Sequence, residues 1–369
     1  MKFKKKFSIP FVFFMLIGYA HASGQSIHIP SNADLFENKN ILILGGTGYL
    51  GRAITTEVLK YNPKKVIIFS RDEVKHFNMT KIYGHNTKIE SIIGDIRDYN
   101  SVLRATRGID IVFHVAALKR MDTIESNVEE AIKTNLMGSL NVLNACEANN
   151  VDQMLFISTD KACSPINAYG ACKFVSEKIF TNYDKRHVKT KFVVTRFGNI
   201  LESTGSVIPI FVDKIKSGQE IPLTDDKMTR FIIAKEEAVE LIFDALRYST
   251  GGEIFVKQLP AMKIVDLIEV LKNKHGAKNP IKVIGLRPGE KIHEMLINES
   301  EMARAIEFKN YYIIRPSIGS LYDIQDQEPA IYLTRGIAVP HESIAHYESS
   351  QTVLSQEELC NLLEKNKLI

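Results

Sequence analysis

The segment LILGGTGYLG, residues 42–51, decides how the first half of this 369-residue chain folds. An apolar run is followed by Gly45, Gly48 and Gly51, which are spaced three residues apart, and an amphipathic pattern begins at once. Glycine has no Cβ, so the backbone can turn tightly and bring its N–H groups to an anion at a helix N-terminus. This strand–turn–helix context predicts a dinucleotide-binding turn. The residues assigned to it are Gly45, Thr47, Gly48, Tyr49, Leu50 and Gly51.

Outward from this turn, short apolar runs alternate with helical patterns. Strands rich in Val, Ile, Leu and Phe indicate a parallel sheet that is covered on both faces. With right-handed crossovers, such a sheet becomes a doubly wound α/β domain. The expected strands are residues 40–44, 65–70, 89–95, 110–117, 154–159 and 191–197, and the expected helices include 49–61, 128–149 and one that carries Tyr169.

After Asn199 the alternation becomes irregular, which predicts a smaller substrate-binding lobe built from discontinuous segments. The last helix carries a capping box, Ser355 with Glu358. The expected organisation is an extension over 1–34, a cofactor domain over 35–200 to which 232–258 returns, a lobe over 201–350 and a C-terminal helix over 351–369.

Composition excludes several classes of protein. The net charge of +4 equals the four lysines at positions 2, 4, 5 and 6, so the body is electrically balanced and has no basic stripe for nucleic acid. The four cysteines have neither zinc-site spacing nor the pattern of a disulfide framework. We therefore expect no metal site and no nucleic-acid partner.

The N-terminus, MKFKKKFSIPFVFFMLIGYAHAS, has the layout of a secretory signal: lysines, an apolar run and a small-x-small end. The run is shorter than the ~20 residues of a spanning helix, and Pro10 interrupts it. The alternative interpretation is an upstream extension or a misassigned start, with the protein proper beginning near Leu35.

The residues after the second expected strand bear on the cofactor. Arg71 suits the 2′-phosphate of NADP, and Lys75 adds a second positive charge, whereas Asp72 argues for NAD. The sequence favours NADP. Four further residues follow the third and fourth strands, where a cofactor would lie: Asp95, Ile96, Ala116 and Lys119. For Asp95 a helix N-cap is the competing interpretation.

Tyr169 and Lys173 lie at positions i and i+4 of an expected helix that follows the fifth strand. On one helix face, the lysine ammonium would lower the tyrosine pKa and make Tyr169 a base for a substrate hydroxyl. The hydroxyl would lose its hydrogen as hydride to the nicotinamide. The bare pattern is weak evidence, because Tyr61 and Lys65 repeat it by chance around Pro63.

The order of motifs resembles that of the extended short-chain dehydrogenases/reductases, which have a Rossmann fold. Within them, the chain is similar to the inverting UDP-N-acetylglucosamine 4,6-dehydratases of polysaccharide biosynthesis. The likeness runs from about Leu35 almost to the C-terminus. The motifs that carry it are the glycine turn, SRDE, GDIRD, AALK, STDKA, Tyr-x-x-x-Lys, RFGN, MTRF and RPGEKIHE.

The resemblance implies a lyase that recycles NADP internally. Oxidation at carbon 4 would acidify the proton at carbon 5, and loss of the 6-hydroxyl as water needs a base and an acid close together. The resemblance makes Lys161 the base and Asp160 the acid, with Thr159 orienting the sugar. A lysine base must be partly neutral, so we expect burial and a nearby cation to lower the pKa of Lys161.

The resemblance also implies substrate contacts, and it shows two departures. The substrate residues would be Lys119, Asn199, Val207, Thr224 and Arg287, the last on the UDP diphosphate. His293 is read as structural. Glu202 and Thr204 stand where the family usually has Gly and Arg, and Glu202 would place a negative charge near the cofactor phosphates.

The expected product is UDP-2-acetamido-2,6-dideoxy-L-arabino-hex-4-ulose, early in the synthesis of a surface-glycan or flagellin sugar. Two alternatives stay open: a UDP-sugar 4-epimerase, and a non-catalytic NADP-binding scaffold or sensor. Because NADP and UDP-sugars are cytoplasmic, we expect the body to work in the cytoplasm, with possible weak membrane association through the N-terminus. By analogy of fold, we expect a homo-oligomer.

Overall fold

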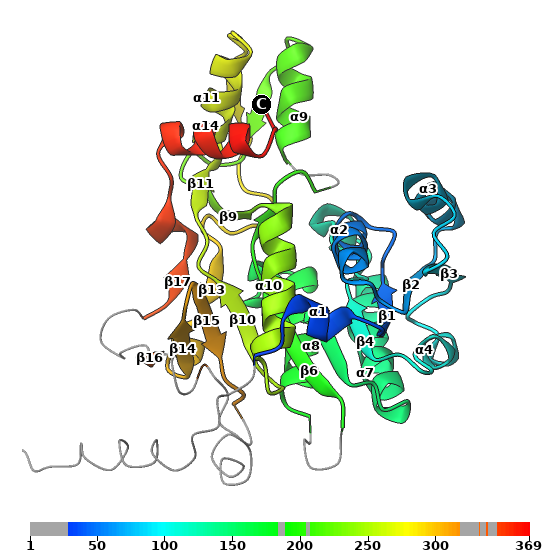
Figure 1. Ribbon diagram of the computed structural model, residues 1–369. Coiled ribbons are helices and arrows are strands. Elements are labelled where there is room, and N and C mark those ends of the chain that lie inside the picture. Colours follow the sequence, from blue (N-terminus) through cyan, green and yellow to red (C-terminus); the bar gives the residue numbers. More distant parts are fainter. Residues whose placement is uncertain (1–28, 184–188, 204–206, 318–331, 333–336, 339–344) are drawn as a thin grey trace, which may run out of the picture.

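The computed structural model describes residues 29–183, 189–203, 207–317, 332, 337–338 and 345–369. The signal-like run and Thr204 lie outside the described residues. The body is a ten-stranded sheet with helices on both faces, joined to a smaller lobe (Figure 1). Within the described part of the chain, no helix is both long and apolar enough to cross a membrane.

Seven neighbouring strands of the large sheet are parallel, and three more extend it in antiparallel fashion at one edge. The order is β16-β14-β15-β10-β6-β5-β4-β1-β2-β3. The strands are β1 (Asn40–Leu44), β2 (Lys65–Ser70), β3 (Ile89–Ile93), β4 (Ile111–His114), β5 (Gln153–Ile157), β6 (Lys191–Arg196), β10 (Ile254–Lys257), β14 (Ala305–Phe308), β15 (Tyr311–Ile314) and β16 (Ile337–Ala338). The order reverses between β1 and β4, which is the switch point where such folds bind a dinucleotide.

Helices cover both faces of this sheet. One face carries α2 (Tyr49–Val58) and α10 (Lys235–Tyr248), which contact each other, and the other face carries α4, α7 and α8. The flanking elements are α1 (Asn32–Phe36), η1 (Leu59–Tyr61), α3 (Glu73–Tyr83), α4 (Tyr99–Ala105), α5 (Met121–Ile124), α6 (Val128–Ala131), η2 (Ile132–Met137), α7 (Gly138–Ala148) and α8 (Ala168–Thr181). The doubly wound architecture predicted from the sequence is confirmed.

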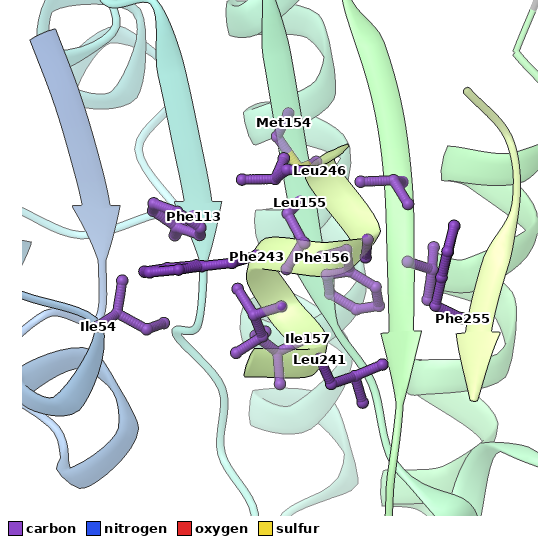
Figure 2. Packing of buried hydrophobic residues seen from close by; sticks show 14 of the residues in the cluster. Ile54, Phe113, Met154, Leu155, Phe156, Ile157, Leu241, Phe243, Leu246 and Phe255 are labelled. Atoms are coloured by element: carbon purple, nitrogen blue, oxygen red, sulfur yellow. The ribbon is translucent and has the colours of Figure 1, made fainter. Parts of the chain in front are cut away.

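Burial on both faces explains the continuous apolar strands. From α10, Phe243 packs 6.3 Å from the ring of Phe113 on β4 and 4.6 Å from Phe36 on α1. Figure 2 shows α10 laid over the β5 side chains Met154 to Ile157. A helix after residue 200 thus covers strands that precede it in the sequence, so the cofactor domain is not continuous in sequence.

Three segments differ from expectation. The helix expected over 128–149 contains a π-helical turn, η2, which places Asn135 against the Leu118 backbone. The Asn135 side-chain amide accepts from the Leu118 N–H and donates to the Leu118 C=O, both at 2.8 Å. Residues 232 and 233, expected to return to the cofactor domain, instead end strand β9 (Thr229–Ile233), which belongs to a separate three-stranded sheet. Residues 305–314 also join the large sheet.

The smaller lobe has its own apolar core, formed mainly by helices α9, α11 and α14 around short strands. Its elements are β7 (Asn199–Ile200), α9 (Val207–Lys216), β8 (Ile221–Leu223), β9 (Thr229–Ile233), β11 (Ala261–Lys263), α11 (Ile264–Lys274), β12 (Ile281–Val283), β13 (Met295–Ile297), α12 (Glu299–Met302), β17 (Tyr347–Glu348), η4 (Ser349–Thr352) and α14 (Gln356–Lys365). The capping box of Ser355 and Glu358 at the start of α14 is confirmed.

The expected boundary at residue 35 falls inside a folded helix. Ser31 caps α1 in a capping box with Asp34, and Asn32 donates to the Tyr61 hydroxyl at 2.9 Å. Phe36 is fully buried. Residues 31–34 therefore belong to the cofactor domain, because they hold α1 against α10 and η1.

Candidate active site

The glycine turn has the geometry that an anion site needs. Gly45 has a positive φ of 82°, and a Cβ there would lie 2.7 Å from the Ala116 nitrogen, so the turn closes only with glycine. Gly48 is the N-cap of α2 and provides no side-chain cap, which leaves the first N–H groups of that ten-residue helix free for a ligand. The turn therefore fits a dinucleotide pyrophosphate.

Charged and hydroxyl side chains gather at the end of β2. The Thr47 and Ser70 hydroxyls lie 2.9 Å apart, which joins the glycine turn to this strand end. Asp72 caps α3 by accepting from the Lys75 N–H, and its carboxylate also pairs with the Lys75 ammonium at 3.2 Å. The Asp72 carboxylate is thus already paired with Lys75, while the Arg71 side chain is half exposed.

The ends of β3 and β4 carry the other cofactor candidates. Asp95 accepts from the Arg97 N–H and side chain and lies 3.5 Å from Arg71; these charges and hydrogen bonds outweigh burial, so the pKa of Asp95 is lowered. The N-cap of α4 is Asp98, so the capping role considered for Asp95 is wrong. Ile96 is buried, and Lys119 is exposed beside the Leu118 backbone held by Asn135.

After β5, the chain enters a 3-10 turn, η3 (Asp160–Ala162), which carries the expected acid and base. The Lys161 ammonium lies 3.0 Å from Asp160 Oδ1, to which the Thr159 hydroxyl also donates at 2.9 Å. Asp160 is fully buried. The start of α8 passes so close that a Cβ on Gly170 would clash with the Lys161 carbonyl oxygen. This glycine therefore lets the turn and α8 meet.

A carboxylate that the sequence analysis assigned no role completes this cluster. Glu294 Oε1 lies 3.3 Å from the Lys161 ammonium and 3.9 Å from Arg230 Nε of β9. Glu294 is the last residue of the RPGEKIHE motif. The motif was therefore the sequence signal that could have pointed to Glu294. Only the fold shows that this residue, 133 positions after Lys161, lies beside it.

The protonation expected for Lys161 is wrong. Burial by itself would lower the pKa of Lys161, but Asp160 and Glu294 outweigh burial and the repulsion from Arg230. The pKa is therefore raised, and the resting side chain is an ammonium.

The explanation expected for Tyr169 is also wrong. Burial raises the pKa of Tyr169 to about 12, and the charge that opposes this rise is Lys161, helped by a hydrogen bond with Thr159. Lys173 instead donates to the Ile157 carbonyl at 2.7 Å and lies 4.2 Å above the Phe156 ring. Burial lowers the pKa of Lys173 to about 7.

The substrate candidates lie on separate elements of the lobe side. Asn199 is exposed at the start of β7, Val207 begins α9, Thr224 follows β8, and Arg287 is exposed in the loop after β12. Among the described residues, neither a hydrogen bond nor an ion pair joins these four to the Lys161 cluster. His293 bonds the Thr229 hydroxyl at 2.8 Å through Nδ1, a contact within the lobe.

Glu202, one of the two departures, adopts a left-handed φ of 62°, a conformation that favours glycine. Its carboxylate accepts from the Tyr49 hydroxyl at 2.7 Å, and Tyr49 is the first residue of α2. The Glu202 carboxylate is therefore tied to the helix that follows the glycine turn.

The family described as polysaccharide biosynthesis protein matches residues 41–316. A UDP-N-acetylglucosamine 4,6-dehydratase (inverting) from Campylobacter jejuni is 44% identical over 288 residues, which cover 77% of this chain and 85% of the relative. A UDP-glucose 4-epimerase from Rickettsia bellii is 43% identical over 286 residues, which cover 76% of this chain and 84% of the relative. Relatives of similar identity thus have names for two activities.

Solved structures share the fold. Pen from Bacillus thuringiensis superposes with a TM-score of 0.83 at 37% identity, covering 90% of this chain and 99% of that one. DesIV, a dTDP-glucose 4,6-dehydratase from Streptomyces venezuelae solved with NAD and TYD bound, has a TM-score of 0.63 at 21% identity, covering 69% of this chain and 86% of that one. The second likeness concerns the fold alone.

Proposed function

The chain belongs to the polysaccharide biosynthesis protein family, and from that premise we propose that it is an inverting UDP-N-acetylglucosamine 4,6-dehydratase. The observation that carries the proposal is the buried Asp160–Lys161 couple beside Tyr169. Oxidation and reduction at carbon 4 need a tyrosine and a dinucleotide, whereas elimination of water also needs an acid and a base close together. The couple provides both.

The cofactor is a nicotinamide dinucleotide, and we propose NADP. The glycine turn fits the pyrophosphate, and Arg71 with Lys75 offers two cations where a 2′-phosphate would lie. Asp72, the residue that would favour NAD, is held by Lys75. When bound, NADP would accept a hydride from carbon 4 and return it to carbon 6.

The residues of the chain then divide the proton chemistry among them. Tyr169 takes the proton of the 4-hydroxyl, and Lys161 faces Tyr169 and favours its phenolate. Lys161 removes the carbon-5 proton as a neutral amine, and Asp160, 3.0 Å from the Lys161 nitrogen, passes that proton to the departing 6-hydroxyl, which leaves as water. Thr159 orients the sugar. Arg287 binds the diphosphate, and Asn199, Val207, Thr224 and Lys119 line the sugar. Return of a proton to the other face of carbon 5 inverts that centre.

A UDP-sugar 4-epimerase is the second candidate, favoured by the Rickettsia bellii relative. An epimerase uses the same Tyr169 but eliminates nothing, so it has no use for Asp160 and Lys161. Incubation with UDP-N-acetylglucosamine and no added reductant separates the two by mass spectrometry. Loss of one water with solvent deuterium at carbon 5 supports the dehydratase. An unchanged mass with an altered sugar overturns it in favour of the epimerase, and tight NADP binding without turnover of any UDP-hexose would indicate a scaffold or sensor.

We also propose that the body works in the cytoplasm, where its UDP-sugar and NADP are made. We further propose that it forms a homo-oligomer. Several apolar side chains are exposed on the helices beside α8 and suit contact with a second copy of the chain. They are Val128, Ile132 and Met137. Fractionation of cells with N-terminal sequencing tests the location. A mature chain that begins at Ser23 and is recovered outside the cytoplasm would contradict it.

A further inference from the structure

The Lys161 ammonium is enclosed by charged side chains from several elements. Asp160 belongs to the same turn, Glu294 precedes β13, and Arg230 lies on β9. From α8, Tyr169 also faces it. The two carboxylates balance the two cations, so the cluster is electrically neutral with every acid ionised.

Glu294 is rigidly placed and poorly solvated. It is 2% exposed, its N–H donates to Ser349 Oγ at 2.9 Å, and its carbonyl accepts from the Ser349 N–H at 2.8 Å. Two residues on, the Leu296 carbonyl accepts from buried Arg196 at 2.7 Å. Yet Glu294 Oε2 has no hydrogen-bond partner among the described residues. A buried carboxylate oxygen without a donor is costly and calls for an explanation.

Of the two carboxylates, Glu294 accepts fewer hydrogen bonds. Asp160 Oδ1 accepts two short hydrogen bonds, from Thr159 at 2.9 Å and Lys161 at 3.0 Å, although its Oδ2 has no described partner. Among the described residues, Glu294 Oε1 faces Lys161 at 3.3 Å and a more distant Arg230 at 3.9 Å. Glu294 can therefore receive a proton from Lys161 without losing a second short hydrogen bond.

We propose that Glu294 accepts the proton of the Lys161 ammonium and so creates the neutral amine that removes the carbon-5 proton. The inference rests on the proposed function. The Lys161 N–H bond breaks and an O–H bond forms on Glu294 Oε1, and no oxidation or reduction occurs. The amine then bonds the carbon-5 proton, while the C–H electron pair moves toward the carbon-4 ketone.

The proposal makes a specific statement about pH. Because the transfer is internal, the number of bound protons does not change, and the rate of the carbon-5 exchange step in the wild-type enzyme, measured after the ketone has formed, should be flat between about pH 7 and 9. In Glu294→Gln the amide cannot accept a proton, while Asp160 still faces the ammonium. Lys161 must then lose its proton to solvent, so the rate should rise about tenfold per pH unit.

The test is single-turnover dehydration of UDP-N-acetylglucosamine, with two readouts. Absorbance of reduced cofactor follows oxidation at carbon 4, and mass spectrometry in D2O follows exchange at carbon 5. Glu294→Gln should keep the first step and slow the second about 100-fold at pH 7. Glu299→Gln, an exposed carboxylate on α12, is the matched control and should behave as wild type.

Each other outcome counts against the proposal. A Glu294→Gln rate that matches the control, or that is low at every pH, would leave Glu294 a structural role only. If the variant does not fold, the wild-type profile decides alone, because a rise of tenfold per pH unit there would mean loss of the Lys161 proton to solvent. A wild-type enzyme that forms no ketone and loses no water contradicts the proposed function itself.

Discussion

At the residue scale, the cluster around Lys161 explains how one ammonium can be buried at all. Its side chain is 13% exposed, while those of Asp160 and Glu294 are 0% and 3% exposed. Three ions removed from water would destabilise the fold unless each is paired. The same pairing that makes the cluster stable keeps Lys161 protonated, so catalysis needs a way to remove that proton.

Lys161→Ala should abolish dehydration, by about 100-fold or more, and leave NADP affinity unchanged, because the proposed function places Lys161 at the sugar and the dinucleotide at the glycine turn. Two buried carboxylates then lack their ammonium, so the free energy of unfolding should also fall by about 3 to 5 kcal/mol. Fluorescence titration with NADP and the water-loss assay measure the two effects, with Lys178→Ala as control. An NADP affinity that falls with activity would contradict this assignment.

Lys173 should make stability depend on pH. Burial lowers its pKa to about 7, whereas the unfolded chain has a lysine pKa near 10.4, so the unfolded state binds more protons between these values. The free energy of unfolding of the cofactor-free protein should therefore rise with pH from 7 to about 8.5, by about 1.4 kcal/mol per unit from this group. Lys173→Met should remove that contribution.

Urea unfolding of both proteins at several pH values checks the Lys173 prediction. The window ends near pH 8.5 because burial raises the pKa of Cys172 and of the other buried thiols, which opposes stability at higher pH. Equal slopes for wild type and Lys173→Met would show that Lys173 is not the group responsible.

At this scale, sequence patterns predicted some residues of the candidate site and missed others. Periodicity located the helix start that carries Tyr169 and Lys173, whereas the roles predicted for Asp160 and Lys161 came from the family resemblance. Glu294 received no role because its motif, RPGEKIHE, does not show that the residue lies beside Lys161. The directions of the Lys161 and Tyr169 pKa shifts were wrong because folding buries Tyr169 and brings Glu294 to Lys161.

At the element scale, Arg196 joins three segments inside the molecule. Its guanidinium on β6 is fully buried and binds Glu177 of α8 at 2.5 and 2.9 Å and Glu301 of α12 at 2.8 Å. The pKa of Glu301 falls to about 2 because the Arg196 charge and hydrogen bonds outweigh burial. Through Leu296, Arg196 also anchors the segment that carries Glu294.

Arg196→Met should lower the free energy of unfolding by about 3 to 5 kcal/mol, because two buried carboxylates lose their counter-ion. Arg104→Met, at an exposed helix end, should cost less than about 1 kcal/mol. Urea denaturation measures both. A loss below about 1 kcal/mol for Arg196→Met would show that the triad is not needed for stability.

At the scale of the whole molecule, the sequence predicted the parallel sheet and its helices, since each run of buried strand residues is local. It missed β14 and β15 joining the far edge, because strand pairing is a long-range choice that period alone does not determine. It also placed the start of the fold four residues late, since α1 is too short to show a helical period.

Removal of residues 1–28 should leave dehydration and thermal stability unchanged, whereas a protein that starts at Leu35 should melt about 2 to 4 °C lower. The second truncation deletes the Ser31 cap and the hydrogen bond from Asn32 to Tyr61. Calorimetry of the full chain and the two shortened forms measures this. Equal melting temperatures for both truncations would return the boundary to residue 35.

The distance in sequence between Lys161 and Glu294 also sets an order of events during synthesis. Strands β1 to β6 are complete by Arg196, so the parallel core can form before the lobe has left the ribosome. Until Glu294 arrives, Lys161 has only Asp160 as its carboxylate partner within the emerged chain. The nascent chain would thus complete its glycine turn and the Asp160–Lys161 pair well before the second carboxylate of the Lys161 cluster is synthesised.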